Sequence, residues 1–158
     1  MLRSNRSLYL RLGATLLAAV LVAVIALVVI NGGQREPEPT ATEAGAALKT
    51  HILQLLDEVF AQNVQIIDPG GKDIACGNDK SKRTFAVTGL DSDTESTPYS
   101  LNVRMLSAMD VVADYDITDS SGAVIRMANE ATKTVILLES TAKGTFSVRG
   151  ETQCLSRS

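Results

Sequence analysis

The feature that most constrains this chain is its apolar stretch from Leu12 to Ile30, LGATLLAAVLVAVIALVVI, nineteen residues without a charge. As a helix rising 1.5 Å per residue it is about 28 Å long, close to the roughly 30 Å hydrocarbon core of a bilayer. A helix that is apolar on every face needs an apolar surround, which a chain of 158 residues can hardly build. The stretch therefore predicts one transmembrane helix at 12–30 that contacts the lipid bilayer.

The basic residues around this stretch indicate its orientation. Arg3, Arg6 and Arg11 precede it, whereas the first residues after it carry one arginine against two glutamates. Because segments rich in Lys and Arg stay in the cytoplasm, we expect a cytoplasmic leader at 1–11. The N-terminus is then inside, and the remaining chain lies outside the cytoplasmic membrane as a single-pass protein.

A cleaved signal peptide is the alternative interpretation of the same stretch. Such a peptide also has a basic start, but its apolar run is usually about 7 to 15 residues long. The residues at the end of the apolar stretch, Val-Ile-Asn-Gly-Gly at 29–33, lack the clear small-x-small pattern of a signal-peptidase cleavage site. We therefore favour a retained anchor; cleavage would leave a secreted domain.

Small residues on the apolar stretch offer a surface for a second helix. Ala19, Ala23 and Ala26 lie at spacings of four and three, so one face of the helix allows close approach. This face would suit a membrane-protein partner. A plain tether is the alternative, because alanine is ordinary in membrane spans and no Gly-x-x-x-Gly pair is present.

Charge and aromatic content exclude several kinds of partner. All 18 acidic residues follow Gly33, together with 12 of the 15 basic ones, so this part of the chain has a formal charge of −6. Binding to phosphate backbones needs a concentrated basic surface, and we therefore expect no nucleic-acid partner. Six aromatic residues without Trp argue against a stacking platform for sugars or bases and indicate an aliphatic core.

The two cysteines, Cys76 and Cys154, lie near the start and the end of the expected domain. An even number of cysteines outside the membrane predicts a disulfide. The chain-entropy model gives on the order of 4 to 5 kcal/mol for closing a loop of about eighty residues. A reactive thiol is the alternative, but it needs a basic neighbour, and the sole histidine, His51, lies on the predicted first helix.

A linker at 31–41 precedes the first helix of the domain. Its Glu-Pro repeat resists helix formation and favours an extended spacer. Thr40 followed by Glu43 marks a helix start, with Thr42 as the alternative cap, and the helix should run to about Asn63. The apolar residues of this helix recur on one stripe with a period of 3.6 and should pack on the core: Leu48, Ile52, Leu55, Leu56, Val59 and Phe60.

A strand and a second helix are expected next. The turn sequence Asp-Pro-Gly-Gly at 68–71 precedes Thr84–Leu90, whose alternating apolar residues predict a strand. Thr97-Pro98 has the form of an N-cap followed by proline at the first helical position. Residues 99–113 fit a helical stripe and, in part, the alternation of a strand; we favour a helix because fifteen residues without Gly or Pro exceed an ordinary strand.

The C-terminal part consists of short extended runs separated by turns, at 115–118, 123–127, 132–140 and 144–149. These runs predict an antiparallel meander. The expected fold class is therefore α+β, a single extracytoplasmic domain at 42–158 in which two helices cover one face of an antiparallel sheet of about four or five strands.

No residue pattern in the domain specifies a reaction. Asp114-x-Asp116 begins like a calcium-binding EF-hand loop, but Asp119 stands where that loop needs glycine and Ile125 where it needs a glutamate. Pairs of carboxylates occur in almost any acidic domain, and nothing in the sequence places two of them in one cleft. We therefore assign no catalytic residue, no cofactor and no metal ligand, and we expect a protein that is not an enzyme.

The C-terminal segment from Gly144 to Cys154 resembles the last strand of small, uncharacterised actinobacterial envelope proteins that carry a membrane or lipid anchor. The resemblance covers about 46–155 and includes Val87-Thr88-Gly89 at the end of a strand and the final Thr152-Gln153-Cys154. This chain departs from that group in lacking an aromatic-rich second helix and in having Gln153 where proline is common. The group has no agreed activity, so the resemblance implies the fold and the disulfide and no function.

These features together favour a membrane-anchored binding or accessory domain of the cell envelope. The alternative is a carboxylate-dependent envelope hydrolase. An enzyme should show a concave pocket with convergent carboxylates of perturbed pKa, whereas a binding domain should offer an exposed apolar patch or strand edge.

Overall fold

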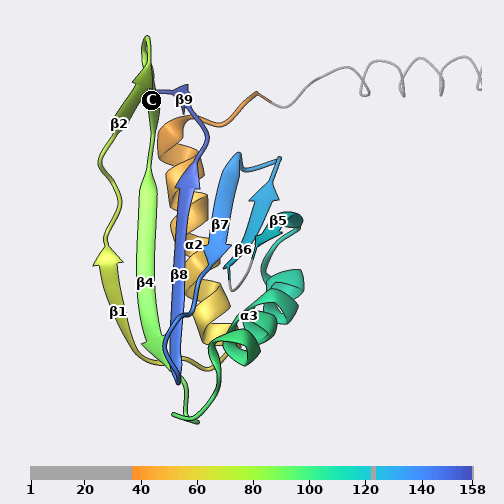
Figure 1. Cartoon of the computed structure of the whole chain (residues 1–158). Coiled ribbons are helices and arrows are strands. Elements are labelled where there is room, and N and C mark those ends of the chain that lie inside the picture. The colour runs from red at the N-terminus through yellow and green to blue at the C-terminus, as the bar shows by residue number, and fades with distance from the viewer. Residues whose placement is uncertain (1–36, 122–123, 158) are drawn as a thin grey trace, which may run out of the picture. The chain divides into compact units, whose positions relative to one another are not determined.

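The computed structural model describes residues 37–121 and 124–157, which form two helices and nine strands in two sheets (Figure 1). No helix among these residues combines the length and the apolar character needed to cross a bilayer. The predicted span at 12–30 and the leader at 1–11 lie outside the described residues.

Helix α2 (Ala41–Glu58) begins where the sequence predicts, with Thr40 as its cap. The Glu43 carboxylate accepts a hydrogen bond from the Thr40 backbone N–H at 2.8 Å, and the Thr40 hydroxyl oxygen accepts one from the Glu43 N–H at 3.3 Å. This reciprocal pair satisfies two N–H groups that a helix start leaves without partners. The local sequence therefore determines where α2 begins.

The end of α2 differs from the prediction. The helix ends at Glu58 rather than near Asn63, because Phe60 adopts a left-handed backbone with φ 56° and turns the chain. The residues that follow form β1 (Gln62–Asp68), a strand that the sequence did not predict. Most of β1 is exposed, so its side chains show no alternation of buried and exposed positions that could have indicated a strand.

The main sheet has six antiparallel strands in the order β1-β4-β8-β7-β6-β5. Its remaining members are β4 (Thr84–Leu90), β5 (Asp116–Ser121), β6 (Val124–Asn129), β7 (Thr134–Leu138) and β8 (Thr145–Thr152). β4 confirms the predicted strand, and β5 to β8 confirm the predicted meander. The expectation of about four or five strands was wrong, because β1 adds an edge strand and a second sheet is present.

The second sheet is small and holds the chain end. Its order is β2-β3-β9, formed by β2 (Ile74–Gly77), β3 (Lys80–Lys82) and β9 (Leu155–Ser156). A disulfide joins Cys76 to Cys154, with 6.0 Å between their Cα atoms, and confirms the predicted pairing. Strands β2 and β9 of this sheet lie at the same end of the domain as the start of α2 (Figure 1).

Helix α3 (Pro98–Val112) confirms the helical interpretation of residues 99–113. The Thr97 hydroxyl oxygen accepts a hydrogen bond from the Ser100 N–H at 3.3 Å, and Pro98 occupies the first turn, where a missing N–H costs nothing. Asn102 ties the helix to the β7–β8 loop, because its side-chain oxygen accepts a bond from the Ser140 N–H at 3.0 Å.

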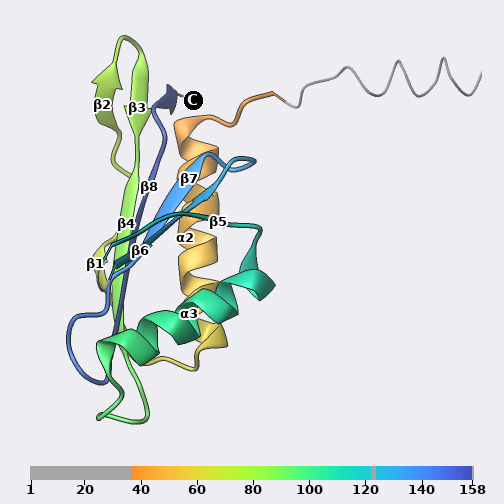
Figure 2. The same cartoon turned by 45° about the vertical axis from the view of Figure 1, so that its right-hand side comes forward.

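Both helices cover the same face of the main sheet, and the core lies between them and the strands (Figure 2). Gly150 on β8 permits a close approach of α2: a Cβ there would lie 2.5 Å from Leu48 Cδ1 and 2.7 Å from the Val135 carbonyl oxygen. The core is aliphatic, as predicted, apart from two phenylalanines and one tyrosine. Its largest fully buried side chains are Phe85, Phe146, Leu48, Ile52, Leu55, Leu56, Leu101, Met105, Met109, Met127, Ile136 and Leu138.

Candidate functional site

The face of the main sheet that bears no helix carries the candidate site, and we call it the helix-free face. Strand register aligns six residues in one row across all six strands of this sheet. In spatial order they are Asp119, Arg126, Leu137, Arg149, Ala86 and Asp68. Arg126 and Arg149 thus flank Leu137, two strand spacings or about 10 Å apart at the backbone.

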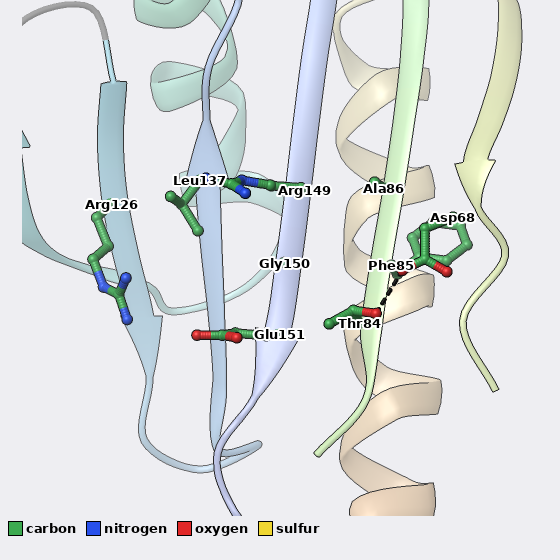
Figure 3. A pocket seen from close by; sticks show the side chains of 9 residues that line it. All are labelled: Asp68, Thr84, Phe85, Ala86, Arg126, Leu137, Arg149, Gly150 and Glu151. Carbon is green, nitrogen blue, oxygen red and sulfur yellow. Dashed lines mark hydrogen bonds between the residues drawn. The ribbon is translucent and has the colours of Figure 1, made fainter. Parts of the chain in front are cut away.

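A hollow of about 290 Å³ opens at this row (Figure 3). Residues of five strands line it: Asp68, Thr84, Phe85, Ala86, Arg126, Leu137, Arg149, Gly150 and Glu151. Ala86 contributes little side-chain volume beside longer charged neighbours in the same row, and this difference contributes to the depression in the sheet surface. The hollow therefore combines a small apolar floor with two arginines and two carboxylates.

The carboxylate of Asp68 is held in its ionised form. Thr84 donates its hydroxyl proton to Asp68 Oδ2, and the Gly70 backbone N–H donates to Oδ1 at 2.9 Å (Figure 3 shows the Thr84 bond). These two hydrogen bonds lower the pKa of Asp68 below its usual value, and the bond from Thr84 contributes more than the bond from Gly70. A carboxyl group that serves as a general acid near neutral pH needs a raised pKa, so Asp68 is unsuited to that role.

The other charged residues of the hollow differ in their pairing. Lys82 Nζ lies 2.7 Å from Glu151 Oε2, and Arg149 Nε lies 2.9 Å from Glu139 Oε2. Arg126 forms no ion pair with any residue in 37–121 and 124–157, although Asp119 is its cross-strand neighbour. Within that part of the chain, the guanidinium of Arg126 is therefore the charge of the hollow that is left for a ligand.

A separate hydrogen-bonded chain joins α2 to the sheet at the histidine. His51 Nδ1 lies 3.1 Å from the Tyr115 hydroxyl, which lies 2.7 Å from Thr134 Oγ1. Burial lowers the pKa of His51, and burial raises that of Tyr115. The sequence placed His51 only as a boundary residue of the first helix. Its partner Tyr115 is 64 residues away, and no local pattern connects the two.

The remaining sequence predictions can be placed on the structure. The candidate calcium aspartates Asp114, Asp116 and Asp119 are exposed, and no group of three potential metal ligands lies together in the described ranges. Sequence reasoning missed the hollow, because it draws its residues from five separate strands. The alternation of apolar with charged or hydroxyl residues in 145–152 is the signal that could have indicated one polar sheet face.

Comparisons of the chain with protein-family models, with curated proteins and with solved structures give no match.

Proposed function

We propose that the protein is a binding or accessory domain of the cell envelope and that the hollow of the helix-free face holds a ligand with a negatively charged group. Arg126 carries the proposal, because the other charged residues lining the hollow already have partners. A guanidinium offers several N–H donors in a planar fork that matches a carboxylate or a phosphate. Leu137, its neighbour in the row, suits an apolar part of the same ligand.

The proposal places this domain outside the cytoplasmic membrane, tethered by the span at 12–30. The Cys76–Cys154 disulfide supports this location, because disulfides persist in oxidising compartments and are rare in the cytosol. A linker at 31–41 would separate the domain from the bilayer. The same arrangement leaves the hollow accessible to envelope molecules or to a neighbouring membrane protein.

A carboxylate-dependent hydrolase is the competing function, and the hollow does contain Asp68 and Glu151. Its chemistry argues for binding instead. Asp68 has a lowered pKa, and Glu151 forms an ion pair with Lys82 at 2.7 Å. Asp68 therefore lacks the raised pKa that a carboxylic acid needs to protonate a leaving group, and the carboxylate of Glu151 is already paired with an ammonium group.

Titration of the full-length protein in phosphatidylcholine nanodiscs tests the proposal, with citrate and inorganic phosphate as the anionic probes. We expect saturable binding that Arg126→Gln weakens on the order of tenfold, the loss of one charge-assisted contact. Arg157→Gln is the matched control, since Arg157 is an exposed arginine outside the hollow. Equal affinities of wild type and Arg126→Gln for both probes would refute the anion site.

Assays for hydrolysis separate the two functions. The binding proposal predicts no turnover of envelope esters or peptides by the full-length protein. A hydrolytic activity that Asp68→Asn or Glu151→Gln abolishes would establish the competing enzyme instead.

A further inference from the structure

Beside the guanidinium of Arg126, the hollow of the helix-free face holds a second charge that no ion pair balances. The Asp68 carboxylate accepts hydrogen bonds from the Thr84 hydroxyl and the Gly70 backbone N–H, which are both neutral groups. It forms no ion pair in the described part of the chain. An ionised carboxylate has about four acceptor sites, so Asp68 can still bind a cationic group.

These two charges, which are opposite in sign, lie at opposite ends of the hollow. Strand register places Arg126 on β6 and Asp68 on β1 in the same row, with β7, β8 and β4 between them. Neighbouring strands are about 4.8 Å apart, so the two backbone positions are separated by about 19 Å. Figure 3 shows the two side chains on opposite sides of the residues that line the hollow. A ligand that binds both must be extended and must carry opposite charges at its ends.

The residues between these two ends suit the backbone of a peptide. Leu137 and Ala86 offer apolar contacts, and Arg149 lies between them in the row. Arg149 Nε lies 2.9 Å from Glu139 Oε2, and the Arg149 side chain is 58% exposed. A guanidinium has five N–H donors. The donors that the ion pair does not use can therefore bind carbonyl oxygens of an extended chain.

We propose that the hollow binds a short peptide with free ends, with its amino group at Asp68 and its carboxylate at Arg126. This inference rests on the anion site proposed above and adds the class of ligand. An extended chain rises about 3.3 Å per residue, so about four to six residues span the distance between the two charged side chains. The peptide lies across the strands and contacts Leu137 and Ala86 on the way.

The separation of the two charges selects this ligand over others with charged groups. The amino and carboxyl groups of a free amino acid are joined through a single carbon atom, so they cannot reach Asp68 and Arg126 at once. The phosphate and amine of a zwitterionic lipid headgroup are also only a few bonds apart. A dicarboxylate would pair with Arg126 at one end and be repelled by Asp68 at the other.

Calorimetric titration of the full-length protein in phosphatidylcholine nanodiscs tests the inference, with pentaalanine as the probe. We expect saturable binding when both ends of the peptide are free. Acetylation of its amino end should weaken binding to the wild type on the order of tenfold and should make no difference to Asp68→Asn. Amidation of its carboxyl end should likewise weaken binding to the wild type and make no difference to Arg126→Gln.

Peptide length provides a second arm of the experiment. Dialanine carries the same two charges but is too short to reach both Asp68 and Arg126. We expect it to bind the wild type on the order of tenfold more weakly than pentaalanine, because one charge-assisted contact is lost.

Two control variants separate the amino-group site from general electrostatics. The bond from Thr84 lowers the pKa of Asp68 most, and the charge of Lys72 also lowers it, so Lys72 competes with a bound amino group for the same carboxylate. Lys72→Gln should therefore strengthen the binding of pentaalanine. Arg157→Gln, outside the hollow, should bind it as the wild type does. Circular dichroism should show the same fold for every variant.

Several results would overturn the inference. These are a lack of saturable pentaalanine binding, equal affinities of the wild type for free and acetylated pentaalanine, and equal affinities for pentaalanine and dialanine. All three comparisons use the wild type, so they decide the matter even if Asp68→Asn fails to fold. The anion site would still stand if Arg126→Gln weakened the binding of citrate or phosphate. Unchanged binding of those two anions in Arg126→Gln would refute the anion site itself.

Discussion

Arg104 on α3 holds the buried carboxylate of Asp91 at the end of β4, with 2.6 Å between Nη1 and Oδ2. The Asp91 side chain is 2% exposed and that of Arg104 is 41% exposed. Burial raises the pKa of Asp91, but hydrogen bonds from Ser96 and Arg104 and the charge of Arg104 outweigh it, so the pKa lies below its usual value. Through a bond to the Val59 carbonyl oxygen, Arg104 also joins α2 to this contact.

Replacing Arg104 by Met should lower the free energy of unfolding by about 2 to 3 kcal/mol, because the Asp91 charge would be left buried without its partner. Urea unfolding followed by circular dichroism measures the loss. Adding Asp91→Asn should restore part of the stability, since no unpaired buried charge then remains. A loss in Arg104→Met no larger than in Arg157→Met would contradict this account.

Gly150 should tolerate no side chain, because a Cβ there would lie 2.5 Å from Leu48 Cδ1 and 2.7 Å from the Val135 carbonyl oxygen. Gly150→Ala should therefore destabilise the domain by about 1 to 3 kcal/mol through overpacking. Thermal unfolding is the measurement. Gly77→Ala is the control, since the nearest atom to a Cβ at that glycine is 3.9 Å away. Equal melting temperatures for the two variants would show that α2 does not pack closely on β8.

The stability of the domain should fall between pH 7 and pH 5 because of His51. Burial lowers the pKa of His51 in the folded state, whereas in the unfolded chain it is about 6.5. The unfolded state therefore binds the proton more readily than the folded state. The contribution of neutral His51 to the free energy of unfolding is present above a pH of about 6.5, and it is lost as the pH falls from there through the pKa of the folded state. His51→Gln should flatten this part of the profile. Unfolding free energies measured at several pH values between 8 and 5 provide the test, and an unchanged slope in the variant would contradict it.

Loss of the Cys76–Cys154 disulfide should destabilise the domain on the order of 4 kcal/mol, because it closes a loop of 78 residues by sequence separation. The double variant Cys76→Ser, Cys154→Ser compared with the wild type in urea measures the effect. Mass spectrometry of the unreduced protein provides the independent check. Two thiols open to alkylation would show that the bond does not form.

The span at 12–30 predicts an N-terminus inside and a domain outside the cytoplasmic membrane. A membrane-impermeant reagent applied to intact cells should modify Asp79→Cys, an exposed position of the domain, and should leave Asn5→Cys in the leader unmodified. The reverse labelling would contradict the orientation. Release of the domain from membranes by washing alone would favour the secreted alternative.

The small residues of the span provide one further expectation. Ala19→Leu with Ala23→Leu should weaken association with a second helix and leave insertion intact, because leucine is at least as apolar as alanine. Cross-linking in membranes measures the association. If it is unchanged, the span is a plain tether.

The sequence alone determined the elements whose signals are local. The capping pair Thr40 and Glu43 located the start of α2, and Thr97 with Pro98 located the start of α3. The alternation in Thr84–Leu90 identified β4 with its correct ends. The two cysteines predicted the disulfide, because an even number in a segment expected outside the membrane indicates pairing. Each of these signals depends on residues within one turn or one strand, or on composition.

Only the tertiary structure decided the features that depend on distant segments. β1 was missed because an edge strand with exposed side chains has no buried face to impose alternation. The predicted meander already places β7 between β6 and β8, but the register that pairs both Arg126 and Arg149 with Leu137 is encoded by no local pattern. His51 likewise meets Tyr115, 64 residues away, only in the folded chain. Propensity and capping act over a few residues, whereas strand order and side-chain proximity depend on how the whole core is buried.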